Sequence, residues 1–324
     1  MSKGFIPRWR FYLLSSVMIL VFAVLAGRLV QLHVFEHERL SRIVEHNREH
    51  VRTLYARRGN LIDRKGNLLA TTRTVYEIGV DPQSVELEEA KKKLTDLSRL
   101  MDKDPDVIEQ AMSKRTRIIE GPDGPGRVDV QWVKLMDSAS EDEYEAILEL
   151  GLDGVYGNRK FVRHYPGAKL AAHLLGFVNK EGTPVMGVEQ YMKFYLEGQD
   201  GWLEYERDGR KQDSAKFRKR KVEPKNGMHV QLTIDQLVQH QVEKEILRLK
   251  REFKPKAVSI IVSEPSTGNI LALANYPTFD PNQFWDYTLD HHRNRAVSDI
   301  IEPGSTFKAV TVAAALNEGL VEAD

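Results

Sequence analysis

The longest apolar run of the chain lies close to its N-terminus. Residues 11–27 carry no charged side chain, and Lys3, Arg8 and Arg10 flank the run on its N-terminal side. Together with the apolar residues that follow it, the run is about long enough to cross a hydrocarbon core of ~30 Å. The basic residues before it predict a cytoplasmic N-terminus. We predict a cytoplasmic tail at 1–10, a single transmembrane anchor at 11–32, and the remaining chain outside the inner membrane.

A cleaved signal peptide is the alternative reading of this segment, because residues 24–26 (VLA) could form a cleavage site. The apolar core of a signal peptide is usually ~7–15 residues long. Here the run is longer and continues into Leu29, Val30 and Leu32. Its length favours an anchor that stays attached.

Between the anchor and about residue 225, short apolar stretches alternate with helical periodicity and polar turns. Residues 36–53 are highly charged and predict a stalk, and the turn residues 63–67 separate two apolar stretches as in a β-hairpin. Helical spacing predicts further helices within 85–115, 140–150, 163–178 and 187–201. This mixture predicts an α+β stem over residues 36–225.

Two segments of the stem lack such periodicity. Glycine and proline dominate residues 120–127 (EGPDGPGR) without a phosphate-binding pattern, which predicts a connecting loop. The only strongly basic run covers residues 216–225. We interpret this run as a solvated interdomain loop rather than as a dedicated anion site.

The pattern changes after residue 227. The predicted elements are, in order, a strand, a helix, a buried strand and its hairpin partner, at 228–235, 236–253, 257–265 and 269–277. We predict that a second domain begins here, and that residues 228–324 form its N-terminal part.

Composition narrows the function classes. A length of 324 residues with 41% hydrophobic content allows about two folded units, and 47 basic against 47 acidic residues gives no bulk reason to expect a nucleic acid partner. The absence of cysteine excludes disulfide frameworks and thiol chemistry. His291 and His292 are adjacent rather than four residues apart, so we expect no metal site, and no cofactor is implied.

The candidate chemistry lies near the C-terminal end of the sequence. A Pro-Gly break at 303–304 precedes Ser305, which opens a predicted helix of small apolar residues, and we expect this helix to be buried. Lys308 follows one turn later on the same face. Its amine could therefore reach the hydroxyl of Ser305.

Serine becomes a good nucleophile when a base takes its proton, and lysine can serve as that base if burial and a helix N-terminus lower its pKa. Backbone N–H groups at the same helix start could help to stabilise an oxyanion. The alternative is structural: Ser305 would be an N-cap and Lys308 an exposed helix residue.

Residues 293–308 (RNRAVSDIIEPGSTFK) resemble the first active-site motif of class B penicillin-binding proteins. Three upstream segments are also similar to motifs of that family, in the expected order: 57–70, 187–198 and 266–284. The resemblance implies a stem, or dimerisation, domain followed by the start of a transpeptidase domain with a serine β-lactamase-like fold.

By this resemblance, Ser305 is the acylated nucleophile and Lys308 its general base, and both take part in binding substrate and penicillin. The implied substrate is the D-Ala-D-Ala end of peptidoglycan stem peptides, and β-lactams would acylate the same serine. The implied partners are the membrane, a polytopic glycan polymerase and divisome proteins. Residues 293–295 and 302–304 resemble the septal, cell-division branch.

One departure from the family pattern matters. The second motif, Ser-x-Asn, and the third, Lys-Thr-Gly or Lys-Ser-Gly, occur nowhere in the sequence. We therefore expect the isolated chain to be inactive and its C-terminal part to fold poorly alone. Two alternatives stay open: a truncated, membrane-tethered stem that binds divisome or polymerase partners without catalysis, and a serine hydrolase of the β-lactamase or signal-peptidase kind.

Overall fold

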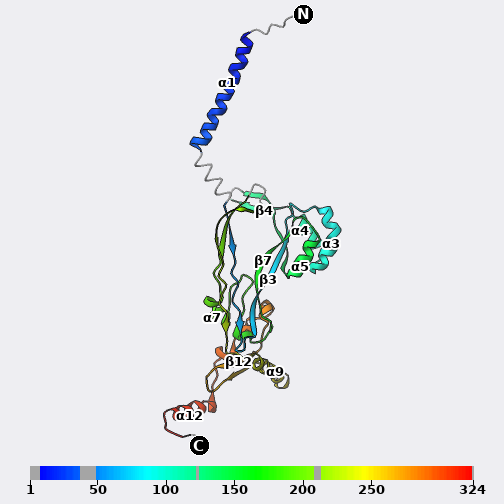
Figure 1. Ribbon diagram of the computed structural model, residues 1–324. Coiled ribbons are helices and arrows are strands. Elements are labelled where there is room, and N and C mark those ends of the chain that lie inside the picture. Colours follow the sequence, from blue (N-terminus) through cyan, green and yellow to red (C-terminus); the bar gives the residue numbers. More distant parts are fainter. Residues whose placement is uncertain (1–7, 37–48, 122–123, 208–212, 323–324) are drawn as a thin grey trace. The chain divides into compact units, whose positions relative to one another are not determined.

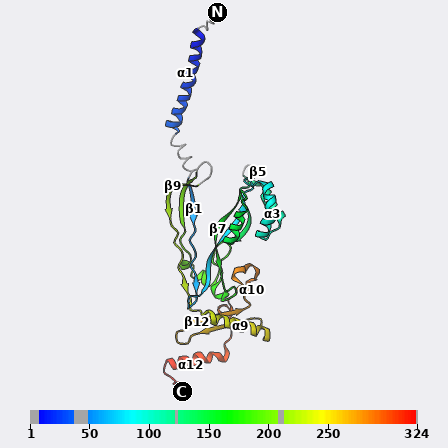
Figure 2. The ribbon, with the colours of Figure 1, turned by 45° about the vertical axis from the view of Figure 1, so that its right-hand side comes forward.

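The computed structural model describes residues 8–36, 49–121, 124–207 and 213–322 (Figures 1 and 2). The chain divides into two compact units, each assembled from separate stretches of sequence. The first unit comprises Met1–Ala56 and Gln199–Lys225, and the second comprises Arg57–Gly198 and Asn226–Asp324. Most of the predicted stalk falls on residues 37–48, which lie outside the described residues.

The first unit begins with the apolar helix. Helix α1 covers Arg8–Val30, and a single π-helical turn, η1, follows at Gln31–Phe35. Within the described residues, α1 is the one helix long and apolar enough to cross a membrane, with a mean hydropathy of 2.3 over Tyr12–Val30. Its apolar side chains are exposed. These properties fit a single-pass membrane anchor.

The same unit contains a three-stranded antiparallel sheet in the order β1-β8-β9, with strands at Glu49–Leu54, Gly201–Arg207 and Asp213–Val222. The basic run that the sequence analysis assigned to a loop belongs largely to β9, so that prediction was wrong. In β9, Val222 lies opposite Trp202 and Lys221 opposite Leu203. Backbone hydrogen bonds form this ladder, and they do not require apolar side chains.

The second unit is built around a five-stranded sheet. Its strands are β10 (Val230–Gln231), β2 (Leu61–Ile62), β3 (Leu68–Val80) and β6 (Val133–Ala139) in that order, and β7 (Val155–His164) pairs with β3. Strands β2 and β3 form the hairpin predicted at 57–72. The two-residue strand β10 runs parallel to β2, so a segment predicted to open the second domain completes the sheet of the stem.

Three helices lie on one side of this sheet: α3 (Leu87–Met101), α4 (Pro105–Ser113) and α5 (Glu141–Glu149) (Figure 1). They confirm the helices predicted within 85–115 and 140–150. Helix α5 begins with a capping box, in which Ser140 and Glu143 each bond the other's backbone N–H. Apolar side chains from the helices and strands, such as Leu97, Ile108 and Ile78, are fully buried between them.

The predicted loop at 120–127 was wrong, because its described residues belong to two paired strands, while residues 122–123 lie outside the described residues. Strands β4 (Thr116–Gly121) and β5 (Gly124–Asp129) pair in an antiparallel ladder. Alternation of apolar and polar residues is weak here because the described residues of β5 are exposed on both faces. Strands are usually predicted from alternating apolar and polar residues, a pattern that arises when one face of the strand is buried.

Three short helices follow β7: α6 (Ala172–Leu175), α7 (Gly187–Tyr191) and α8 (Lys193–Leu196). Helix α6 confirms the short apolar helix within 163–178. The predicted helix at 187–201 is split into α7 and α8, and the chain leaves α8 through Glu197 in an extended conformation. The side chain of Glu189 in α7 is fully buried, which an amphipathic surface helix does not predict.

Glu189 binds two arginines, and we call Arg58, Arg163 and Glu189 the buried ion cluster. One carboxylate oxygen lies 2.7 Å from Nε of Arg58 and the other 2.7 Å from Nε of Arg163. The side chains are exposed by only 11%, 2% and 0% for Arg58, Arg163 and Glu189. The cluster therefore joins the start of the stem, strand β7 and helix α7 through charges removed from water.

The turn of the β2–β3 hairpin is tied to the following region by Asp63. One oxygen of this fully buried carboxylate accepts the backbone N–H groups of Lys65 and Asn67, both at 2.8 Å, and the other accepts that of Gln236 at 3.2 Å. Burial raises the pKa of Asp63, but hydrogen bonds from these three residues lower it, so the net shift is downward. Asp63 therefore fixes the conformation of the hairpin turn and links it to the start of α9.

The rest of the second unit starts with helix α9 at Gln236–Phe253, with the same bounds as predicted. Strands β11 (Val258–Ser263) and β12 (Ile270–Tyr276) form the predicted antiparallel hairpin. Strand β11 is half-buried rather than buried, because its residues alternate between partly buried and exposed. Five short elements follow: η2 (Pro281–Asp286), α10 (Leu289–His292), α11 (Arg295–Ser298), η3 (Gly304–Phe307) and α12 (Lys308–Asn317).

Candidate active site

Ser305 and Lys308 lie within one turn of the chain. Ser305 belongs to the 3₁₀ turn η3, and Lys308 is the first residue of α12. The backbone N–H of Lys308 donates to the carbonyl oxygens of Ser305 and Thr306. The sequence analysis placed Ser305 at the start of the helix, and the structure inserts a tighter turn there. Within the described part of the chain, no hydrogen bond joins the Ser305 hydroxyl to the Lys308 amine.

The local sequence explains this turn. Gly304 has φ of +53°, a left-handed conformation that glycine adopts without steric cost. Pro303 precedes it and accepts hydrogen bonds at its carbonyl from both the backbone N–H and the hydroxyl of Thr306. The Pro-Gly pair therefore redirects the chain, as the sequence predicted, and opens the 3₁₀ turn that leads into α12.

The predicted burial of this helix was wrong. All residues from 301 to 322 are exposed except Ala315, which is partly buried, and Val310 and Val312 are more than half exposed, at 56% and 53%. Alanines with high helix propensity form the helix, whereas burial requires an element that covers it. A helix that is apolar on all sides is expected to be buried, but the helix sequence alone does not provide the other element that would bury it.

The segment before the turn is held by charged and amide side chains. Arg293 contacts Asp299 at 2.7 Å, and Arg295 contacts Asp290 at 2.6 Å. Asn275 of β12 reaches this segment from the hairpin: its amide donates to the Asn294 side chain at 2.9 Å, and its carbonyl oxygen accepts the backbone N–H of Ala296 at 3.1 Å. The arginine-rich motif thus anchors the approach to Ser305 on strand β12.

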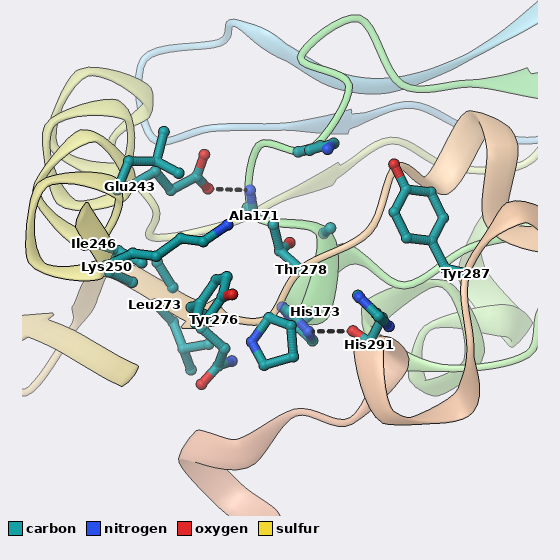
Figure 3. Close-up of a pocket in the computed structure, with 16 residues that line it drawn as sticks. Ala171, His173, Glu243, Ile246, Lys250, Leu273, Tyr276, Thr278, Tyr287 and His291 are labelled. Atoms are coloured by element: carbon teal, nitrogen blue, oxygen red, sulfur yellow. Dashed lines mark hydrogen bonds between the residues drawn. The ribbon is translucent and has the colours of Figure 1, made fainter. Parts of the chain in front are cut away.

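A separate cavity of about 380 Å³ lies between α9, the end of β12, the segment 169–173 and α10 (Figure 3). Ser305 and Lys308 do not line it. Glu243 of α9 accepts the backbone N–H of Ala171 at 2.7 Å, and His173 is bonded through Nε2 to the carbonyl oxygen of His291 at 2.8 Å. Burial raises the pKa of Glu243 and lowers that of His173.

Sequence reasoning missed this cavity. Glu243, Ile246 and Lys250 share one face of the predicted helix at three- and four-residue spacing, which could have indicated a polar wall. The other walls come from residues such as Lys169 and Tyr287 that only the fold brings near. Among the described residues, no group of three or more His, Asp or Glu side chains could hold a metal ion.

Known proteins resemble the chain along nearly its whole length. The family descriptions "Penicillin-binding Protein dimerisation domain" and "Penicillin binding protein transpeptidase domain" match residues 53–232 and 258–324. "Probable peptidoglycan D,D-transpeptidase PenA" of Neisseria meningitidis is 30% identical over 95% of this chain and 51% of its own length. "Peptidoglycan D,D-transpeptidase FtsI" of Escherichia coli is 29% identical over 97% and 51%.

Solved structures agree with this assignment. A peptidoglycan synthetase from Bifidobacterium adolescentis superposes with a TM-score of 0.54 at 25% identity, over 86% of this chain and 52% of its own. The penicillin-binding protein in a complex of PBP2 and MreC from Helicobacter pylori shares the fold, with a TM-score of 0.59 at 18% identity, over 84% and 53% of the two chains.

The chain spans about half the length of the curated relatives it matches. The order of its parts is the one that the two family descriptions give: an α+β dimerisation domain and then the start of a transpeptidase domain. This chain belongs to the penicillin-binding proteins.

Proposed function

We propose that the chain is the membrane-anchored front part of a peptidoglycan D,D-transpeptidase of the septal branch, with Ser305 as nucleophile and Lys308 as general base. The carrying observation is the turn at 304–308, where a Pro-Gly break sets serine and lysine one turn apart at a helix start. The relatives named D,D-transpeptidases support the reaction class.

In this reaction the Ser305 hydroxyl attacks the carbonyl carbon of the penultimate D-alanine of a stem peptide. Lys308 takes the hydroxyl proton and returns it to the departing nitrogen, so the peptide bond breaks and the last D-alanine leaves. An amine of a neighbouring strand then attacks the serine ester, forms the cross-link and frees Ser305. A β-lactam carbonyl would acylate the same oxygen.

The reaction needs Lys308 without its proton. In the described chain Lys308 and nearly all of α12 are exposed, with no element packed over them. The proposal therefore includes further residues of the transpeptidase domain that pack over α12. These residues would carry the second and third motifs of the family. Because the sequence contains neither motif, we expect the 324-residue chain alone to form no stable acyl-enzyme.

The proposed organisation keeps the predicted boundaries: a tail at 1–10, an anchor at 11–32, a stem at 36–225 and the transpeptidase part at 228–324. With the basic flank of α1 inside, the two sheets would lie on the outer side of the inner membrane. A structural neighbour binds MreC, which supports protein partners for the stem, and we propose a polytopic glycan polymerase and divisome proteins.

Labelling with a fluorescent penicillin tests this function. The reading frame is first sequenced beyond the codon for Asp324, and the longer product, where one exists, is expressed in membranes beside the 324-residue chain. We expect labelling of the longer product, loss of labelling in Ser305→Ala, and a rate lowered at least ~100-fold in Lys308→Met.

Two outcomes would change the conclusion. Stable labelling of Ser305 in the 324-residue chain would contradict its expected inactivity. A stop codon directly after Asp324, with accumulation of the short product, would favour the alternative of a non-catalytic tethered stem.

A further inference from the structure

The cavity beside α9 is not lined by the proposed catalytic residues Ser305 and Lys308. We propose that it binds a small ligand that carries a carboxylate on an apolar body. This inference does not depend on acylation of Ser305, because the catalytic turn contributes no residue to the walls.

The walls of the cavity suit the apolar part of such a ligand. Ile246 of α9 and Leu273 and Ala274 of β12 line it, together with the rings of Tyr276 and Tyr287. Ligand sites of proteins are mostly apolar cavities of ~300–1,000 Å³ with a few polar groups. At about 380 Å³, this cavity suits a ligand no larger than a short peptide end or a substituted aromatic ring.

Two lysine ammonium groups supply positive charge. Nζ of Lys250 lies 4.7 Å from the centre of the Tyr276 ring, and Nζ of Lys169 lies 5.5 Å from the centre of the Tyr287 ring. Within the described chain, neither lysine has a carboxylate at ion-pair distance. An ammonium group over a ring keeps hydrogen-bond donors for an anion. In Figure 3 the Lys250 side chain extends from α9 beside Tyr276.

The negative group of the cavity is already engaged. Oε1 of Glu243 accepts hydrogen bonds from the backbone N–H of Ala171 and from the Gln239 amide, each at 2.7 Å. This carboxyl is held against the wall, and its two donors partly offset its charge. Two lysines against one glutamate leave a net positive cavity, which favours a carboxylate over an amine.

Asn275 and His173, two further polar side chains of the cavity, already form hydrogen bonds within the protein. The Asn275 amide donates to Asn294 and its oxygen accepts from Ser259 at 2.7 Å. The His173 ring is bonded to the His291 backbone. The lysines are thus the charged donors that face the cavity without a partner of opposite charge in the described chain.

Calorimetric titration of the full chain in detergent micelles tests the proposal with two carboxylate probes. N-acetyl-D-alanyl-D-alanine represents a peptide terminus, 4-methylbenzoate represents a free small carboxylate, and 4-methylbenzamide is the uncharged control. We expect at least one carboxylate to bind, and 4-methylbenzamide to bind at least tenfold more weakly than 4-methylbenzoate if the latter is bound. Whichever carboxylate binds more tightly identifies the source of the ligand.

Matched variants locate the binding. The double substitution K169M/K250M should lower carboxylate affinity at least tenfold, whereas K244M, which removes an exposed lysine of α9 outside the cavity, should not change it. Ser305→Ala should bind the probes like the unchanged chain, which separates this site from the proposed catalytic one. All three lysines are exposed, and equal melting temperatures confirm that the variants fold.

Three results would overturn the proposal. The first is absence of binding by both carboxylates. The second is affinity that is unchanged in K169M/K250M or lowered as much in K244M. The third is loss of binding in Ser305→Ala, which would place the probes at the catalytic turn.

Discussion

Replacing Glu189 with glutamine tests whether the buried ion cluster holds the stem together. In the native chain each oxygen of Glu189 accepts one arginine N–H, from Arg58 or Arg163. Glutamine has nearly the same shape but offers one oxygen, and its amide nitrogen would face the other arginine donor. The substitution also leaves two arginine charges without the carboxylate that neutralises them.

The structure sets the expected size of the effect. The Arg163 side chain is 2% exposed, and its second terminal nitrogen, Nη2, already has no hydrogen-bond partner among the described residues. Removing one partner of a buried ion pair typically costs ~3–5 kcal/mol, and a hydrogen bond to a charged group contributes ~1.5–3 kcal/mol. We expect Glu189→Gln to lower the free energy of unfolding of this region by about 3–5 kcal/mol.

Hydrogen exchange measured by mass spectrometry at increasing urea gives that free energy for peptides covering β3 and β7. The matched control is Glu197→Gln directly after α8, whose partner Lys193 lies at 3.6 Å with both side chains about half exposed. An exposed pair of this kind contributes ~0.3–0.5 kcal/mol. A loss below ~1 kcal/mol in Glu189→Gln, or one equal to that of the control, would refute the reasoning.

Three further predictions concern the same unit. Asp63→Ala should lower stability by about 2–4 kcal/mol in urea unfolding, because three backbone N–H groups lose their acceptor. The pKa of Asp63 is lowered in the folded state. Its contribution to stability is therefore present above the ordinary carboxylate pKa and should disappear as the pH falls through the lowered folded-state pKa. Gly227→Ala should cost more than ~3 kcal/mol or prevent folding, because the added carbon would lie 1.8 Å from the Leu196 carbonyl oxygen. In the same unfolding experiment Gly126→Ala should cost less than ~1 kcal/mol, because no atom of the described residues lies within 4 Å of its added carbon. The raised pKa of Glu243 means that the folded state holds its proton more tightly, so stability should fall as the pH rises above the ordinary glutamate range; Glu243→Gln should flatten this limb of a melting-temperature profile.

Local patterns predicted the elements whose cause is local. Helix α9 was found with its bounds because a cap residue, Asp235, and a run of helical spacing define it, and α5 because Ser140 and Glu143 form its capping box. The proposed catalytic pair could be named from the sequence for the same reason, since Ser305 and Lys308 are neighbours along the chain.

Features that depend on distant partners could not be predicted in this way. Strand β9 forms because its backbone pairs with that of β8, although its many charged residues are typical of a loop. The buried ion cluster joins residues 131 positions apart, and a single acidic residue in a short helix does not indicate two arginines. The exposure of α12 likewise depends on whether a neighbour covers it, which its own residues do not determine.

The short parallel pairing of β10 with β2 has a consequence for biosynthesis. The backbone N–H of Asn60, just before β2, donates to His229, just before β10, and these residues are 169 positions apart. At a synthesis rate of ~5–20 residues per second, the later partner emerges roughly 8–34 s after the earlier one. During that interval the edge of β2 is free to pair with other chains. The stem sheet therefore becomes complete late in synthesis. During this interval, strand exchange between neighbouring nascent chains competes with folding.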